Sequence, residues 1–169
     1  CSWPGGNACP QLGQCSSAAK LSSAASTSFH SRRFSANCPA SSAVSAASSS
    51  SISDGAAATV LLSADEAARR GIQPLARIVG HATYSQAPEW FTTAPVAAID
   101  KLLKQVGWTV DQVDLFEVNE AFAVVAMAPI KELGIPHAKV NVNGGACALG
   151  HPIGASGARL VVTLVNALR

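Results

Sequence analysis

The chain has 169 residues and a formal net charge of +2, and it is 49% hydrophobic but only 13% charged. That length is enough for one domain with a buried core. The small net charge gives no reason to expect a nucleic-acid partner, and the sequence contains no apolar run long enough to predict a membrane helix. The five cysteines lack zinc-binding spacing, so no metal is expected, and their odd count favours a reducing compartment such as the cytoplasm.

Residues 1–47 differ in composition from the rest of the chain. All ten acidic residues lie at Asp54 or later, whereas the first 50 residues contain fifteen serines. A segment with so few large apolar residues cannot bury a core, and we predict that it is disordered. It could be an organellar transit peptide, a processed lipoprotein beginning at Cys1, or a stretch read out of frame in a gene fragment. We favour the last of these.

The first predicted elements after this segment are short. Residues 56–62 are apolar and follow an Asp-Gly pair, which predicts a buried strand. Ser63 and Glu66 have the spacing of a capping box for a helix over residues 64–70, which Gly71 would end. Residues 72–80 then have the character of a second strand.

A longer helix and a strand follow. Thr93 is predicted to cap a helix through Val106, with Gly107 ending it; the apolar positions expected to face the core are Val96, Ile99, Leu102, Leu103 and Val106. Residues 115–118 form a predicted strand, so Asn119 would lie at its carboxyl end, where α/β proteins bind ligands. A helix over residues 120–133 should be kinked or broken at Pro129, which lacks the backbone N–H of an interior helical residue.

The segment from Asn141 to Arg159 contains five glycines and one histidine between a strand-like and a helix-like pattern. Val140 and Val142 alternate like the end of a buried strand, and apolar residues recur at helical spacing from Leu160 onward. Glycines in such numbers indicate close backbone approach or positive φ. His151 lies between Gly150 and Pro152, which restricts its backbone to extended conformations. The glycine spacing matches neither a P-loop nor a dinucleotide-binding fingerprint.

Three motifs of the chain resemble those of the thiolase family. Residues 141–159 resemble the signature that reads Gly-Gly followed by Gly-His-Pro-x-Gly-x-Ser-Gly-x-Arg. Residues 119–122 are similar to the Asn-Glu-Ala-Phe block, and residues 50–58 are similar to the segment that closes the first half of a thiolase. The resemblance covers residues 48–169. It implies an α/β fold with layers in the order α/β/α/β/α, of which residues 48–71 would be the end of the first half and residues 72–169 a truncated C-terminal domain.

The resemblance also implies roles for individual residues. Thiolases transfer acyl groups between coenzyme A and acetyl-CoA or a 3-ketoacyl-CoA through an acyl-enzyme on cysteine. His151 matches the histidine that takes the proton from that cysteine, a reaction suited to imidazole. Asn119 matches the asparagine that holds a water in an oxyanion hole. Ser50 matches a serine that contacts the pantetheine arm of coenzyme A. The thioester is a substrate, and no separate cofactor is expected.

The family's two reactive cysteines have no counterpart in the matching region. Cys147 lies four residues before His151, but we interpret it as a small apolar residue of the core. Glu120 and Phe122 are likewise interpreted as structural: the carboxylate would favour its own helix N-terminus and the ring would pack beneath it. We therefore expect a fragment that is inactive alone, from a family whose full-length members are homo-oligomers. The alternatives are a condensing enzyme of the ketoacyl synthase type and a non-catalytic acyl-CoA-binding relative.

Overall fold

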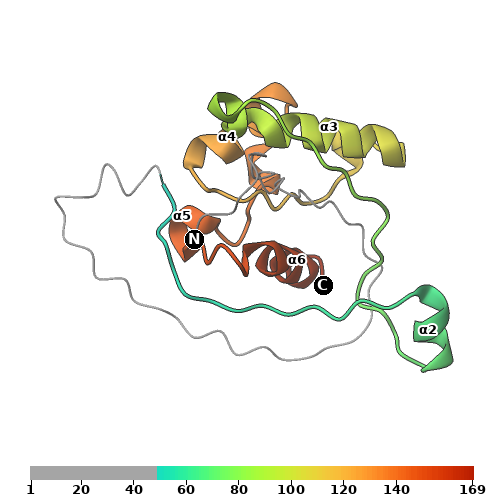
Figure 1. Ribbon diagram of the computed structural model, residues 1–169. Helices are drawn as coiled ribbons and strands as arrows, with labels where there is room; N and C mark the ends of the chain where they lie inside the picture. Colours follow the sequence, from blue (N-terminus) through green and yellow to red (C-terminus); the bar gives the residue numbers. More distant parts are fainter. Residues whose placement is uncertain (1–48) are drawn as a thin grey trace, which may run out of the picture.

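The computed structural model describes residues 49–169, and the predictions for residues 1–47 lie outside this part of the chain. Most of the described chain forms a lobe in which helices lie on both sides of short extended segments (Figure 1). α3 (Ala94–Val106) and α4 (Ala123–Glu132) contact each other on one side, and α6 (Ser156–Ala167) lies on the other. α5 (Ala146–Leu149) precedes α6, and the short 3-10 helices are η2 (Pro88–Thr93), η3 (Val110–Gln112) and η4 (His137–Lys139).

In the centre of the lobe, successive side chains of residues 116–118 contact opposite helical layers. Phe116 and Val118 are buried in one apolar cluster against the α3–α4 layer, whose other buried members are Ile99, Leu103, Val113, Ala126, Ile135 and Val140. Glu117, between them, instead reaches Arg159 on α6. This two-residue period is the one that a strand imposes. The prediction for residues 115–118 is therefore correct in its alternation, although their backbone pairing is limited to isolated bridges such as the parallel bridge from Phe116 to Val140.

Several helix boundaries follow the predicted signals. α3 ends at Gly107, whose φ of 71° is the left-handed conformation that glycine adopts at low cost. α2 (Ala64–Arg69) begins where predicted, with the backbone N–H of Glu66 donating to Ser63 Oγ over 3.2 Å. The Glu66 side chain does not complete the capping box; it pairs with Arg69 and Arg70 instead. Thr93 precedes α3 without a side-chain cap.

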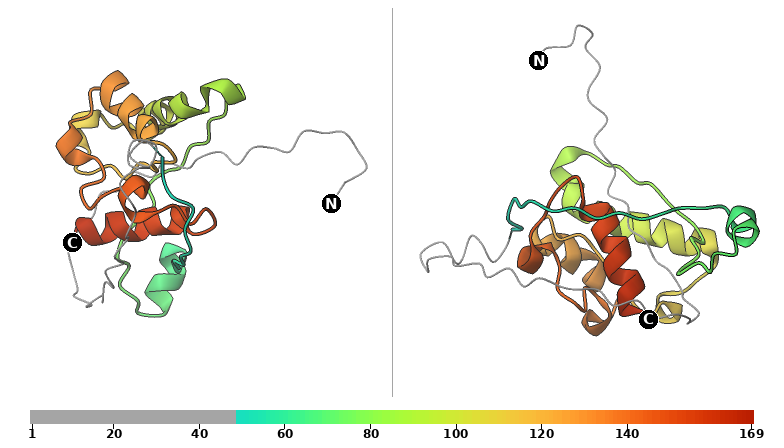
Figure 2. Two further views of the ribbon diagram at one scale, coloured as in Figure 1. Left: turned by 90° about the vertical axis from the view of Figure 1, so that its left-hand side faces the viewer. Right: turned by 90° about the horizontal axis from the view of Figure 1, so that it is seen from below.

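Several predictions made from local patterns differ from the structure. Residues 56–62 and 72–80 form no strands, and most of their side chains are exposed. These segments and α2 make up an arm, residues 53–80, whose ends lie against the lobe at Pro152 and Val106 and whose α2 projects beyond the lobe (Figure 2). At Pro129, where a kink or a break was predicted, α4 is not broken but continues to Glu132, with the proline ring buried. Val142, predicted to be buried, is 45% exposed.

Candidate active site

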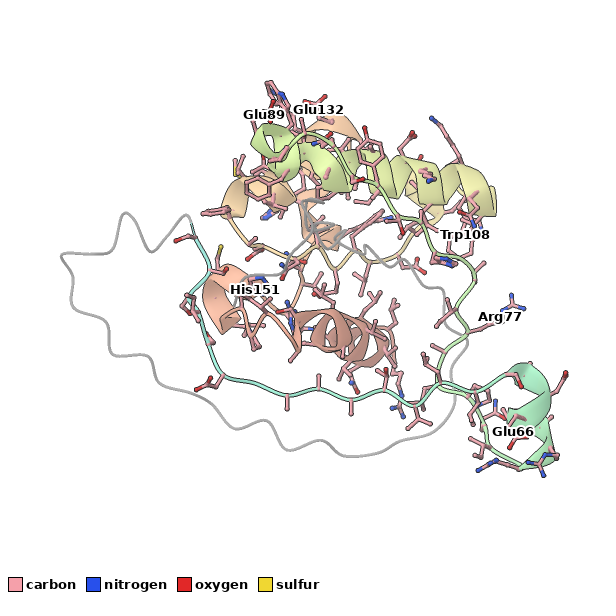
Figure 3. All side chains as sticks on the ribbon, viewed as in Figure 1. Glu66, Arg77, Glu89, Trp108, Glu132 and His151 are labelled. Carbon is pink, nitrogen blue, oxygen red and sulfur yellow. The ribbon has the colours of Figure 1, made fainter. Side chains whose placement is uncertain are left out.

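The site candidates predicted from the sequence come together at one edge of the lobe. Asn119 follows the extended segment 115–118, and His151 lies in the loop that joins α5 to α6, as Figure 3 shows for the histidine. Asn119 Nδ2 and His151 Nε2 are 3.4 Å apart although 32 positions separate the two residues. Both side chains are half-buried. The fold thus places an amide and an imidazole side by side.

Ser50 lies in a segment that hydrogen-bonds to both of these loops. Its backbone N–H donates to the carbonyl of Ala121 over 3.2 Å, and its hydroxyl donates to the same oxygen over 3.0 Å. One residue later, the carbonyl of Ser51 accepts the backbone N–H of His151 over 2.9 Å. Ser50 is therefore close to both loops, but its hydroxyl proton is used in an internal hydrogen bond.

The residue before Asn119 is held by a side chain that sequence reasoning had not singled out. Asn141 Oδ1 accepts the backbone N–H of Val118 over 2.8 Å, and Asn141 Nδ2 donates to the Val118 carbonyl over 2.9 Å. The side-chain amide thereby extends the backbone pairing of residues 116 and 140 by one step. Asn141 has a φ of 49°, a left-handed conformation in which asparagine is among the most favourable side chains.

The residue after Asn119 is held by the glycine-rich segment as well. One Glu120 oxygen accepts from Asn141 Nδ2 at 2.7 Å, and the other accepts the backbone N–H of Cys147 at 3.0 Å. The carboxylate therefore caps α5, not α4 as predicted, and negative charge is favourable at such a helix start. Gly145 is needed there, because a Cβ on it would lie 2.0 Å from the Glu120 carboxyl carbon.

Two further interpretations are corrected by these contacts. Phe122 does not pack beneath Glu120: it is 43% exposed, and its ring meets the Phe91 ring edge-on at 6.0 Å between centroids. Cys147 is only half-buried, and its thiol lies 3.8 Å from the Glu120 carbonyl. Partial burial, followed by the nearby Glu120 charge, raises the pKa of the Cys147 thiol. A raised pKa lowers the fraction of thiolate, which is the nucleophilic form.

A buried ion pair between Glu117 and Arg159 joins the two helical layers near the site. Arg159 Nη1 donates to Glu117 Oε2 over 3.4 Å, with the carboxylate side chain 2% exposed. Desolvation raises the pKa of Glu117, and the Arg159 charge opposes that shift. Glu117 Oε1 and two Arg159 nitrogens have no hydrogen-bond partner among the described residues. The pair connects the extended segment that carries Asn119 to the helix that follows His151.

Other features of the described residues do not extend the site. An open recess of about 390 Å³ is lined by residues 53–57 and 152–155, but neither Asn119 nor His151 faces it. No group of three His, Cys, Asp or Glu side chains in residues 49–169 is arranged to hold a metal ion. Within the same residues, none of the helices is long and apolar enough to cross a membrane.

Comparison with known proteins identifies the family. The family model for the C-terminal domain of thiolase matches residues 72–169. This chain belongs to the thiolase family. It is 57% identical over 118 residues to a probable acetyl-CoA acetyltransferase of Dictyostelium discoideum, a match that covers 70% of this chain and 28% of the relative. It is 50% identical over 117 residues to the cytosolic acetyl-CoA acetyltransferase of Mus musculus, covering 69% and 30%.

The thiolase fold is shown by solved structures too. Acat5 thiolase from Ascaris suum, solved in complex with coenzyme A, superimposes with a TM-score of 0.72 at 49% identity, over 73% of this chain and 32% of that one. The chain thus spans about 30% of the length of the thiolases that it matches. These matches do not favour the ketoacyl synthase or the non-catalytic alternative.

Proposed function

We propose that this chain contributes the histidine and asparagine of a thiolase active site, which transfers acyl groups between coenzyme A and acetyl-CoA or a 3-ketoacyl-CoA. The single observation that carries the proposal is the 3.4 Å approach of Asn119 Nδ2 to His151 Nε2. Two residues distant in sequence but adjacent at a strand end and a glycine-rich loop are typical of an α/β active site. The names of the relatives, acetyl-CoA acetyltransferases, support the choice of thioester substrates.

The proposed roles follow from what each group can do. His151 would take the proton of a cysteine thiol, so that the thiolate attacks the acyl carbon while the protonated imidazole donates a hydrogen bond to the thioester oxygen. Coenzyme A would then leave as its thiolate and take that proton from His151. Asn119 would orient a water toward the same oxygen; its Oδ1 is buried without a partner among the described residues, which leaves an acceptor for such a water. Ser50 would contact the pantetheine arm. No further cofactor enters the proposal.

The proposal does not assign the nucleophile to Cys147, the one cysteine in residues 49–169. Its thiol pKa is raised, and its sulfur hydrogen-bonds to the Glu120 carbonyl at 3.8 Å. We therefore expect no acyl transfer from residues 49–169 alone. Turnover of acetoacetyl-CoA by these residues, with acetyl found on Cys147, would contradict this part of the proposal.

The main test is a chimera, in which the segment of this chain replaces the matching 118 residues of the Dictyostelium discoideum relative. Thiolysis of acetoacetyl-CoA is measured with free coenzyme A. His151→Ala should abolish turnover, and Asn119→Ala should lower kcat roughly a hundredfold, the usual loss for one oxyanion contact. Lys104→Ala, on the exposed side of α3, is the control and should change nothing. A folded chimera in which His151→Ala keeps normal turnover would refute the proposal.

Assembly and location are proposed on the same basis. A homo-oligomer is proposed because the family resemblance implies that full-length thiolases are homo-oligomers. The cytoplasm is proposed because the mouse relative is named as cytosolic. Sedimentation of the chimera and fractionation of cells that express the natural protein would test the two statements.

A further inference from the structure

Within residues 49–169, each nitrogen of the His151 ring has one side-chain hydrogen-bonding neighbour. Ser156 Oγ lies 2.6 Å from Nδ1, and Asn119 Nδ2 lies 3.4 Å from Nε2. A neutral imidazole carries its proton on one nitrogen and a lone pair on the other, so these two neighbours determine which nitrogen can act as a base. The proposed function requires the lone pair on Nε2, the nitrogen that faces Asn119.

The hydroxyl of Ser156 has a second contact that sets its direction. Ser156 Oγ donates to the carbonyl of Pro152 over 3.1 Å, and a carbonyl can only accept. With its single proton used there, the oxygen offers lone pairs to His151 Nδ1, which must then carry the hydrogen. Ser156 is 4% exposed, so water does not compete for either contact.

The other side of the ring agrees with this assignment. The Asn119 amide nitrogen is a donor, and a protonated Nε2 facing it would place two donors against each other. We propose that Ser156 is a positioning residue: it accepts the Nδ1 hydrogen of His151 and thereby keeps the lone pair on Nε2, the nitrogen that is to act as the base. The inference rests on the proposed function for its catalytic consequence, but not for the tautomer itself.

Local structure explains why a serine suits this position. Ser156 is the first residue of α6, and its backbone N–H also donates to the Pro152 carbonyl over 2.9 Å. The turn from His151 to Ser156 is thus closed by Pro152, which brings the hydroxyl back under the imidazole five residues earlier. An alanine would keep the turn and lose the acceptor. A threonine would keep the acceptor.

The tautomer is measured on the full chain labelled with ¹⁵N, by long-range proton–nitrogen correlation of the histidine rings at about pH 8.5, well above the usual imidazole value. His151→Asn identifies the signals of His151 among those of the four histidines. We expect a protonated Nδ1 in the wild type and in Ser156→Thr. In Ser156→Ala the proton should move to Nε2, the position that free histidine side chains prefer. Thr163→Ala, on the same helix, is the matched control.

A protonated Nε2 in the wild-type chain would overturn the inference, and so would an unchanged tautomer in Ser156→Ala. The wild-type spectrum decides the first point even if a variant fails to fold. In the chimera, Ser156→Ala should lower kcat at least tenfold with little change in KM, and Ser156→Thr should restore it. If the tautomer is as proposed but the chimera is inactive with every residue intact, the proposed function fails while the role of Ser156 stands.

Discussion

The arm and the lobe contain similar apolar residues, but those of the arm are exposed and those of the lobe are buried. In the arm, residues 53–80, Val60 is 88% exposed and Ile78 is 69% exposed. In the lobe, residues 94–169, Val113 and Phe116 are 2% and 3% exposed. Both regions contain apolar runs that predict buried strands, but only the lobe supplies helices on both sides of its runs. An apolar pattern thus indicates that a segment can be buried, whereas burial itself depends on a second surface.

Polar contacts divide in the same way between the two regions. Glu66, which Figure 3 labels on α2 of the arm, forms surface ion pairs with Arg69 and Arg70. Glu117 in the lobe is buried against Arg159, 42 positions away. The ion pairs of Glu66 are local and solvated, whereas the Glu117–Arg159 pair in the lobe ties together distant segments that carry the candidate site. The four changes below test this difference, from the largest expected effect to the smallest.

The largest effect is expected from core truncation. Phe116→Ala should lower the free energy of unfolding by about 3–5 kcal/mol, because it removes a large side chain from the lobe's apolar cluster. Ile78→Ala, the same kind of truncation in the arm, should cost less than about 0.5 kcal/mol. Denaturant unfolding monitored by circular dichroism measures both. Equal losses would show that the arm is packed in solution, and the comparison would fail.

The second effect concerns the amide that holds Val118. Asn141→Asp keeps the shape but cannot donate to the Val118 carbonyl, and it places a second carboxylate beside Glu120. We expect a loss of about 2–3 kcal/mol from the unpaired buried groups. Asn166→Asp is the control, since Asn166 is exposed and donates only within α6. If the unfolding free energy of Asn141→Asp equals that of the control within experimental error, the two hydrogen bonds from Asn141 to the Val118 backbone do not stabilise the fold as proposed.

The third effect is a pH dependence of stability. Burial raises the pKa of Glu117 in the folded chain above its ordinary value of 4.5, so the folded state holds this proton more tightly than the unfolded state. Its contribution to stability is complete below that value and declines as pH rises through the folded pKa. Glu117→Gln should therefore flatten the fall in unfolding free energy above pH 4.5.

The arm provides the matched variant for this titration. The pKa of the Glu66 carboxylate is lowered by Arg69 and then by Arg70, which gives the opposite direction, with stability gained above the ordinary value and lost as pH falls through the folded pKa. Because the two arginines of these ion pairs are 70% and 57% exposed, salt should screen the pairs, and Glu66→Gln should leave the slope almost unchanged. Identical pH profiles for wild type and Glu117→Gln would refute the assignment to Glu117.

The smallest effect is on thiol reactivity. Burial and then the Glu120 charge raise the pKa of Cys147, so Glu120→Gln should increase its thiolate fraction and its rate of alkylation by iodoacetamide several-fold at neutral pH. Peptide mass mapping separates Cys147 from the other four cysteines. Glu132→Gln, a change of an exposed carboxylate on α4, is the control. A slower reaction in Glu120→Gln would mean that the carboxylate activates the thiol.

The sequence by itself determined the features that depend on residues close together in the chain. The left-handed glycine after α3, the serine at the start of α2 and the helical period from Leu160 onward each act within a few positions, and each has the predicted effect. His151 and Asn119 were identified by motifs that read like those of thiolases. Their closeness could be expected only from the family resemblance, since no local pattern joins positions 119 and 151.

Tertiary structure decided which groups each side chain contacts. Glu120 caps α5 because the glycine-rich segment brings Gly145 under its carboxylate, and neither contact follows from the spacing of residues 120 and 145. The roles of Asn141 and Ser156 were missed for the same reason: an amide or a hydroxyl acts through the atoms that folding places beside it. The exposure of residues 56–62 likewise depended on the surfaces available to cover them. Hydrogen bonds and burial are pairwise, and a sequence pattern describes one side of each pair.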